Sequence, residues 1–202
     1  MRELKPLDDA KLERAYNEVF REAFPPQELK PLGAIRSMIS EGYYRALALC
    51  EGERELGYIC LWEDLPYVLI DYLCVPRRAR GGGIGGEIIA RTIDAFSPDT
   101  VFIGEAEAPT GDPERDGIIL RRLDFYRRCG AVTLDYDTAL FGVHYKTIVW
   151  TRSKPDAGEV MRRHSGLYRR NFPPALYEAA VRIPLAEGES AEVTGKWERW
   201  RQ

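Results

Sequence analysis

The sequence is poor in the residues that metal centres and histidine-dependent hydrolases require. It contains only two histidines, His144 and His164, and its four cysteines stand singly, without a C-x-x-C pair. A histidine-rich metal site or a Ser-His-Asp triad therefore has little material to work with. We expect reduced cysteines inside the core and no metal cofactor.

Two further absences limit the partners and the location. No run approaches the roughly 20 apolar residues that span a bilayer, and the first five residues lack the apolar core of a signal peptide. The 29 lysines and arginines are outnumbered by 32 aspartates and glutamates, whereas a general nucleic-acid binder needs a surplus of cations. The sequence predicts a cytoplasmic protein that binds neither nucleic acid nor membrane.

What is present is the composition of a globular chain, with 45% of 202 residues hydrophobic. Apolar spacing and turn residues predict an α/β fold, an α+β mixed sheet with helices on both faces. The expected helices cover residues 8–24, 32–39, 85–96 and 116–129. The expected strands cover residues 4–7, 44–50, 56–62, 67–75, 101–107, 131–135 and 144–151.

The pattern changes after Arg152. Residues 153–158 read as a linker, and a basic helix (159–170) and one more strand (181–185) are expected beyond it. We therefore predict a main domain over residues 1–152 and a C-terminal helical extension over 153–202. Trp197 and Trp200 favour an extension that docks on the main domain.

The most informative segment is Arg80–Gly86, which reads RGGGIGG between an apolar run and a predicted helix. Glycine lets the chain come close to a ligand, and the first turn of a helix has unpaired N–H donors and a favourable dipole. Strand, glycine loop and helix in this order predict a site for a pyrophosphate-bearing molecule.

With these residues the chain resembles the GCN5-related N-acetyltransferases, the GNAT superfamily, over about residues 4–152. The loop matches the family motif Arg/Gln-x-x-Gly-x-Gly/Ala, and residues 123–131 (LDFYRRCGA) are similar to the family's second helix end. Two motifs in the right order are more specific than either alone. Two departures are Ala131, where the family usually has an aromatic residue, and Pro76 directly after Val75.

The resemblance implies a GNAT-like acyl-CoA N-acyltransferase fold, with acetyl-CoA as co-substrate and direct attack by a primary amine. It implies that backbone amides of the loop bind the pyrophosphate and that the preceding strand end pairs with the pantetheine arm. Tyr126 would be the proton donor to the departing thiolate. The implied cofactor-binding residues are Leu73, Cys74, Val75, Arg80, Gly81, Gly82, Gly83, Ile84, Gly85 and Gly86.

An attacking amine must lose a proton, so a base is needed. Glu105 and Glu107 stand two residues apart on a predicted strand and hence on one face, which makes either a candidate for the base or for an anchor of a cationic substrate. Asp71 on the preceding strand competes for the same role. A pair of solvated carboxylates on a half-exposed strand is the alternative interpretation.

Other classes remain open. Gly81-x-Gly83-x-x-Gly86 also spells a dinucleotide fingerprint, with Glu105 about twenty residues on, although several strands precede it here. A P-loop is excluded because Glu87 and Ile88 replace its Lys-Ser/Thr. A catalytically silent acyl-CoA sensor or interaction module with the same fold is the non-enzymatic alternative.

The acceptor is the least defined partner. The resemblance allows a small-molecule or a peptide amine. Acidic residues in the turn at 63–64 and in the loop at 109–116 favour a cationic acceptor through long-range attraction, although a solvated polar loop would explain them equally well. A homodimer formed through the C-terminal extension is left open.

Overall fold

The computed structural model describes residues 1–26 and 28–193. Contacts divide the chain into two compact units, residues 1–98 and 99–202. The two tryptophans that favoured docking of the extension, Trp197 and Trp200, lie outside the described residues.

The first unit is built on an antiparallel run of strands, β1 (Arg2–Pro6), β2 (Tyr44–Glu51), β3 (Arg54–Asp64) and β4 (Tyr67–Cys74). Each strand pairs with the next one in the sequence; short turns join β2, β3 and β4, whereas helical segments lie between β1 and β2. The helical segments are α1 (Asp9–Ala15), a π-helical segment (Tyr16–Phe20), α2 (Arg21–Ala23), α3 (Leu32–Ser40), a 3-10 turn (Arg77–Ala79) and α4 (Ile84–Asp94).

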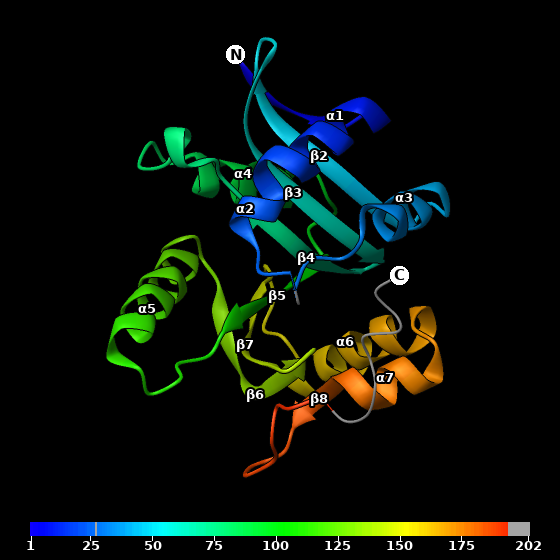
Figure 1. Ribbon diagram of the computed structural model, residues 1–202. Helices are drawn as coiled ribbons and strands as arrows, with labels where there is room; N and C mark the ends of the chain where they lie inside the picture. Colours follow the sequence, from blue (N-terminus) through cyan, green and yellow to red (C-terminus); the bar gives the residue numbers. More distant parts are fainter. Residues whose placement is uncertain (27, 194–202) are drawn as a thin grey trace. The chain divides into compact units, whose positions relative to one another are not determined.

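Helices cover both faces of this sheet, with α1 and α3 in front of the strands in Figure 1 and α4 behind them. Successive strand residues point to opposite faces. Tyr58 packs against Phe20, with ring centroids 5.7 Å apart, whereas its neighbour Gly57 faces α4. A Cβ on Gly57 would lie 2.8 Å from Ile88 Cδ1 and 3.1 Å from the Cys74 carbonyl oxygen. The missing side chain thus lets α4 approach the sheet.

The second unit pairs β5 (Val101–Glu107), β7 (Val143–Trp150), β6 (Val132–Leu140) and β8 (Val181–Leu185), in that spatial order and antiparallel. Its helices are α5 (Pro113–Arg128), α6 (Ala157–Asn171) and α7 (Pro174–Ala180). Strand β8 comes from the predicted extension and pairs with β6, so that segment adds a strand to the sheet of this unit.

The predicted α/β class is confirmed, and most element bounds are met within a few residues. The helix expected over 8–24 is interrupted by the π-helical segment. Helix α5 begins three residues earlier than expected, because Asp112 caps it by accepting hydrogen bonds from the N–H groups of Glu114 and Arg115. The division into 1–152 and 153–202 stays a prediction. Within the described ranges no helix is long and apolar enough to cross a membrane.

The close contact at Gly57 predicts a specific loss of stability. Gly57→Ala places a methyl group against Ile88 and should lower the free energy of unfolding by about 1–3 kcal/mol, the usual cost of overpacking. Gly33→Ala in α3 is the control, because nothing lies within 4 Å of its added Cβ. Urea unfolding of both variants measures the difference, and equal stabilities would show that α4 does not depend on this contact.

Candidate functional site

The glycine loop has a backbone that only glycine adopts easily. Gly81 has φ +82° and Gly83, the N-cap of α4, has φ +74°, both in the left-handed region. Gly81, Gly82 and Gly83 are exposed, and a Cβ added to any of them would meet nothing within 4 Å. The loop is therefore open to a ligand that comes close to its backbone.

The loop leads directly into free hydrogen-bond donors. The first helical bond of α4 runs from Glu87 N–H to the Gly83 carbonyl, at 3.0 Å. The N–H groups of Ile84, Gly85 and Gly86 come before it and have no partner within the helix. Ile84 has a buried side chain, so only its backbone is available to a ligand, and Gly85 and Gly86 are half-buried. Donors at a helix N-terminus make a ready anion site.

Arginines balance the charge around this helix start. Glu87 lies in the first turn of α4, and its carboxylate is bound by Arg2 from β1 at 2.9 Å and by Arg91 at 2.8 Å. Hydrogen bonds from these two guanidinium groups lower the pKa of Glu87. Arg80 Nε donates to the Val75 carbonyl at 2.9 Å, which ties the loop back to the end of β4. Sequence reasoning missed Arg2, which lies far from the motif in the chain.

The strand before the loop carries a bulge at Asp71. Cys60 of β3 pairs with Tyr72 and Leu61 pairs with Ile70, which leaves Asp71 as the extra residue of β4. A bulge turns a side chain away from the regular alternation of the strand. Leu73 continues the ladder, and Cys74 ends β4 with a buried side chain.

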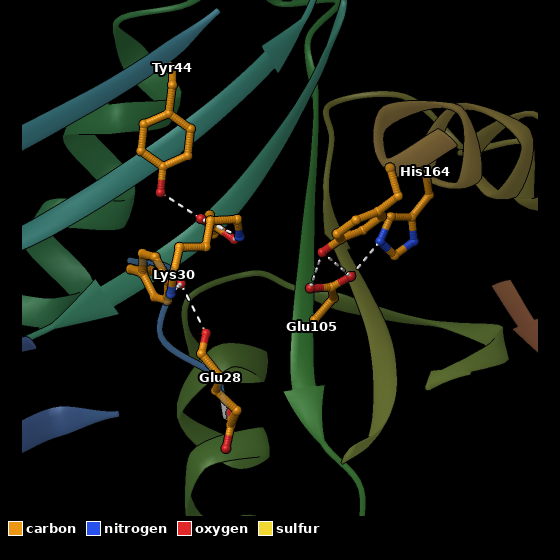
Figure 2. A network of polar contacts seen from close by, with 8 residues as sticks. Glu28, Lys30, Tyr44, Glu105 and His164 are labelled. Atoms are coloured by element: carbon orange, nitrogen blue, oxygen red, sulfur yellow. Dashed lines mark hydrogen bonds and ion pairs between the residues drawn. The ribbon is translucent and has the colours of Figure 1, made fainter. Parts of the chain in front are cut away.

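Both oxygens of Asp71 are engaged inside the first unit, by Lys30 and Tyr44, which Figure 2 labels. Lys30 Nζ lies 2.7 Å and 3.0 Å from them, and the Tyr44 hydroxyl donates to Oδ2 at 2.5 Å. Lys30 also lies 5.4 Å from the ring centroids of Trp62 and Tyr72. Burial, with the Asp71 carboxylate nearby, raises the pKa of Tyr44 well above its ordinary value. This group is a compensated ion pair, and Asp71 has no oxygen left without a donor.

The two carboxylates of β5 are held by different helices. Glu107 binds Arg115 and Arg122 of α5. Glu105 instead accepts hydrogen bonds from His164 and Tyr168 of α6. Glu105 and Glu107 do lie on one strand, as predicted. The two-residue spacing did not show that they have different partners. Sequence reasoning missed His164, whose signal was its place on the core face of α6 together with Val160, Leu167 and Tyr168.

Tyr126 lies in the last turn of α5 and packs edge-on against Trp150, with ring centroids 5.7 Å apart. Its carbonyl accepts the Ala131 N–H at 3.0 Å, which closes the helix end. Burial raises the pKa of the Tyr126 hydroxyl, so it keeps its proton at neutral pH. Tyr126 can donate a hydrogen bond and is a weak proton source.

Burial keeps the cysteine thiols protonated, because it raises their pKa values. Burial raises the pKa of Cys74 to about 12, and it also raises those of Cys50, Cys60 and Cys129. A thiol attacks as its thiolate, so none of these groups is an activated nucleophile. Over residues 1–26 and 28–193, no group of three or more His, Cys, Asp or Glu side chains is arranged to hold a metal ion.

The acidic residues that favoured a cationic acceptor have local partners. Asp112 caps α5, and Asp116 accepts hydrogen bonds from the N–H groups of Thr110 and Gly111. Glu63 pairs with Arg45. These contacts support the interpretation in which the carboxylates shape their own loops.

The comparisons with known proteins follow this geometry. No protein-family model matches the chain. A solved GNAT-family structure from Bacteroides thetaiotaomicron superposes with a TM-score of 0.69 at 17% identity, covering 85% of this chain and 99% of the other. NAA60 of Arabidopsis thaliana, solved with acetyl-CoA, gives a TM-score of 0.56 at 14% identity, covering 74% and 98%. The chain has the GNAT fold. The dinucleotide alternative disagrees with this fold, because β4, which leads into the glycine loop, pairs antiparallel with β3.

A curated relative agrees with this fold. YjbC of Bacillus subtilis, described as a candidate acetyltransferase, is 27% identical over 111 residues, which are 55% of this chain and 53% of the relative. The chain thus spans about half the length of the curated relative that it matches.

The Lys30–Asp71 pair predicts an asymmetric stability effect. Their side chains are only 15% and 5% exposed, so Lys30→Met leaves a buried charge and should cost about 3 kcal/mol. Adding Asp71→Asn removes that charge and should recover part of the loss. The control is Arg36→Met, which breaks an exposed pair with Asp9 (38% and 70% exposed) and should cost less than about 1 kcal/mol. Equal losses from Lys30→Met and Arg36→Met in chemical unfolding would contradict the buried-pair interpretation.

Proposed function

We propose that the chain is an N-acetyltransferase that moves the acetyl group of acetyl-CoA to a primary amine. The observation that carries the proposal is the open glycine loop at the start of α4, in a chain with the GNAT fold. The acetyl-CoA in the Arabidopsis structure supports the choice of co-substrate. Amides of Gly81 to Gly86 would bind the pyrophosphate, with Arg80 beside them and with Leu73, Cys74 and Val75 along the pantetheine arm.

The transfer itself is one displacement. The neutral amine nitrogen attacks the thioester carbonyl, a C–N bond forms, the C–S bond breaks, and the amine proton passes to a base. The protonated state of the thiols supports this route over one through an acetylated cysteine. The acceptor that we propose is a small-molecule or peptide primary amine.

Tyr126 is proposed to assist the departing thiolate by hydrogen bonding. An alkyl thiol such as that of cysteine ionises near about 8.5, below an ordinary tyrosine, and burial raises the pKa of Tyr126 further. Full proton transfer from Tyr126 to the thiolate is therefore uphill. A hydrogen bond from Tyr126 can stabilise the developing negative charge on sulfur without transfer of the proton.

Coenzyme A binding tests the loop. Gly82 has no positive φ and open space around its Cβ position, so Gly82→Val should fold normally while its side chain keeps phosphate away from the backbone. We expect calorimetry to detect coenzyme A binding to the wild type, a loss of at least about tenfold in Gly82→Val, and no binding of NADH.

Gly33→Val is the matched control, since it adds the same side chain in open space far from the loop in sequence. Equal affinities of the two variants for coenzyme A would contradict the loop site. Tight binding of coenzyme A without thiol release from acetyl-CoA, across a panel of amines, would favour the silent sensor.

Tyr126→Phe tests the leaving-group role. Removing the hydroxyl should lower kcat by about tenfold to a hundredfold and leave the affinity for coenzyme A unchanged, because the hydrogen bond matters only as the thiolate forms. Thiol release from acetyl-CoA gives the rate. An unchanged kcat would assign protonation of the thiolate to another group or to water.

A further inference from the structure

A buried polar cluster in the second unit surrounds Glu105 (Figure 2). His164 Nε2 lies 2.7 Å from Glu105 Oε1, and the Tyr168 hydroxyl lies 3.0 Å from both carboxylate oxygens. The His164 side chain is 0% exposed, whereas that of Glu105 is 12% exposed. The carboxylate is thus held from inside the unit, on a side chain that is almost but not fully buried.

The hydrogen bonds continue from Glu105 through His164 to β6. His164 Nδ1 lies 3.2 Å from the Tyr136 hydroxyl of β6. Burial raises the pKa of Tyr136, so its hydroxyl keeps its proton and can donate to Nδ1. With Nδ1 as acceptor, the N–H of the imidazole is on Nε2 and points to Glu105. In this arrangement Glu105 receives two donors, His164 and Tyr168.

Packing alone does not account for this choice of residues. Val160 and Leu167 share the buried face of α6 with His164 and fill the core with apolar groups. A buried polar side chain is costly unless every hydrogen bond is made, so an apolar residue at position 164 would be the simpler core. Here three polar side chains instead fix the orientation of one carboxylate.

We propose that His164 and Tyr168 are positioning residues that hold Glu105 as the base for the acceptor amine. On this proposal the proton leaves the amine nitrogen as the C–N bond forms, joins a Glu105 oxygen and passes to solvent after product release. The inference rests on the N-acetyltransferase function proposed above. It makes α6, a helix of the predicted extension, part of the catalytic machinery.

Substitutions that remove the Tyr168 hydroxyl or the His164 imidazole test these positioning roles in the full chain. Tyr168→Phe removes one hydroxyl and should lower kcat by on the order of tenfold with little change in the acceptor KM. The acidic limb of its rate profile should move to higher pH, because a donor to the ionised carboxylate is lost. Titratable groups beside Glu105 include His164 and Tyr168 from α6, Tyr136 from β6 and Glu107 on the same strand. His164→Leu should lower kcat further, and His164→Gln, which keeps an N–H donor, should restore part of the rate.

Two matched controls exist in the same unit. His144 Nε2 lies 2.7 Å from Asp137, the same geometry as the His164–Glu105 pair, but on a side chain that is 40% exposed. The Tyr177 hydroxyl bonds Ser165 at 2.8 Å without touching Glu105. His144→Gln and Tyr177→Phe should therefore leave kcat and the pH profile unchanged.

The outcomes separate the two proposals. Coenzyme A binding without turnover by the wild type would overturn both the proposed function and this inference. Turnover by the wild type that persists unchanged in Tyr168→Phe or in Glu105→Gln would overturn the inference alone. If His164→Leu fails to fold in thermal unfolding, Tyr168→Phe still decides, because it removes a single oxygen.

Discussion

A carboxylate inside a protein must be compensated, and this constraint organises the polar interior of both units. Asp71 is compensated by the ammonium of Lys30, Glu107 by guanidinium groups of α5, and Glu105 by the imidazole and phenol of α6. The kind of partner distinguishes them. A neighbouring cation favours the ionised carboxylate and opposes its taking up a proton, whereas neutral donors orient it without adding a full positive charge. Of these three carboxylates, Glu105 is held by an imidazole and a phenol and not by a lysine or arginine, which supports its proposed role as the base.

The geometry of the glycine loop depends in turn on how α4 packs on the sheet. Gly57 provides the space into which Ile84 and Ile88 fit. Ile84 is also the first residue of α4. Its side chain anchors the helix on the sheet, and its N–H is the first of the backbone donors that have no partner within the helix. Gly81 and Gly83 before it have left-handed backbone, which an anchored helix start can hold in place. The RGGGIGG motif therefore acts together with packing residues outside it.

The sequence allowed the local features to be predicted well. Apolar periodicity located nearly all strands and helices, and the glycine-rich segment predicted the loop and the start of α4 to within one residue. These features depend on neighbours in the chain. The helix that begins at Asp9 was not predicted to pass through a π-helical segment, because a bulge of this kind leaves the apolar pattern almost unchanged.

The partners of the candidate site residues could not be predicted in the same way. Lys30 and Asp71 are 41 positions apart, and Glu105 and His164 are 59 apart. Such pairings follow from tertiary packing, and a single sequence offers no pattern for them. Even so, the position of His164 on the apolar face of a predicted helix was a readable sign, because a polar residue on a core face needs a partner. The scarcity of histidine argued only against a metal site and said nothing about a structural role for a single histidine.

The raised thiol pKa values bear on what the proposed reaction requires of the acceptor amine. In the proposed function, the raised thiol pKa values argue against an acetylated cysteine, and the amine attacks the thioester directly. Most amines are protonated at neutral pH, and a cation cannot attack. A carboxylate that is fixed in direction and is not locked in an ion pair with a lysine or arginine suits this requirement of the proposal. Helix α6 supplies two of the donors that fix Glu105, so the proposal gives the C-terminal segment a part in the transfer.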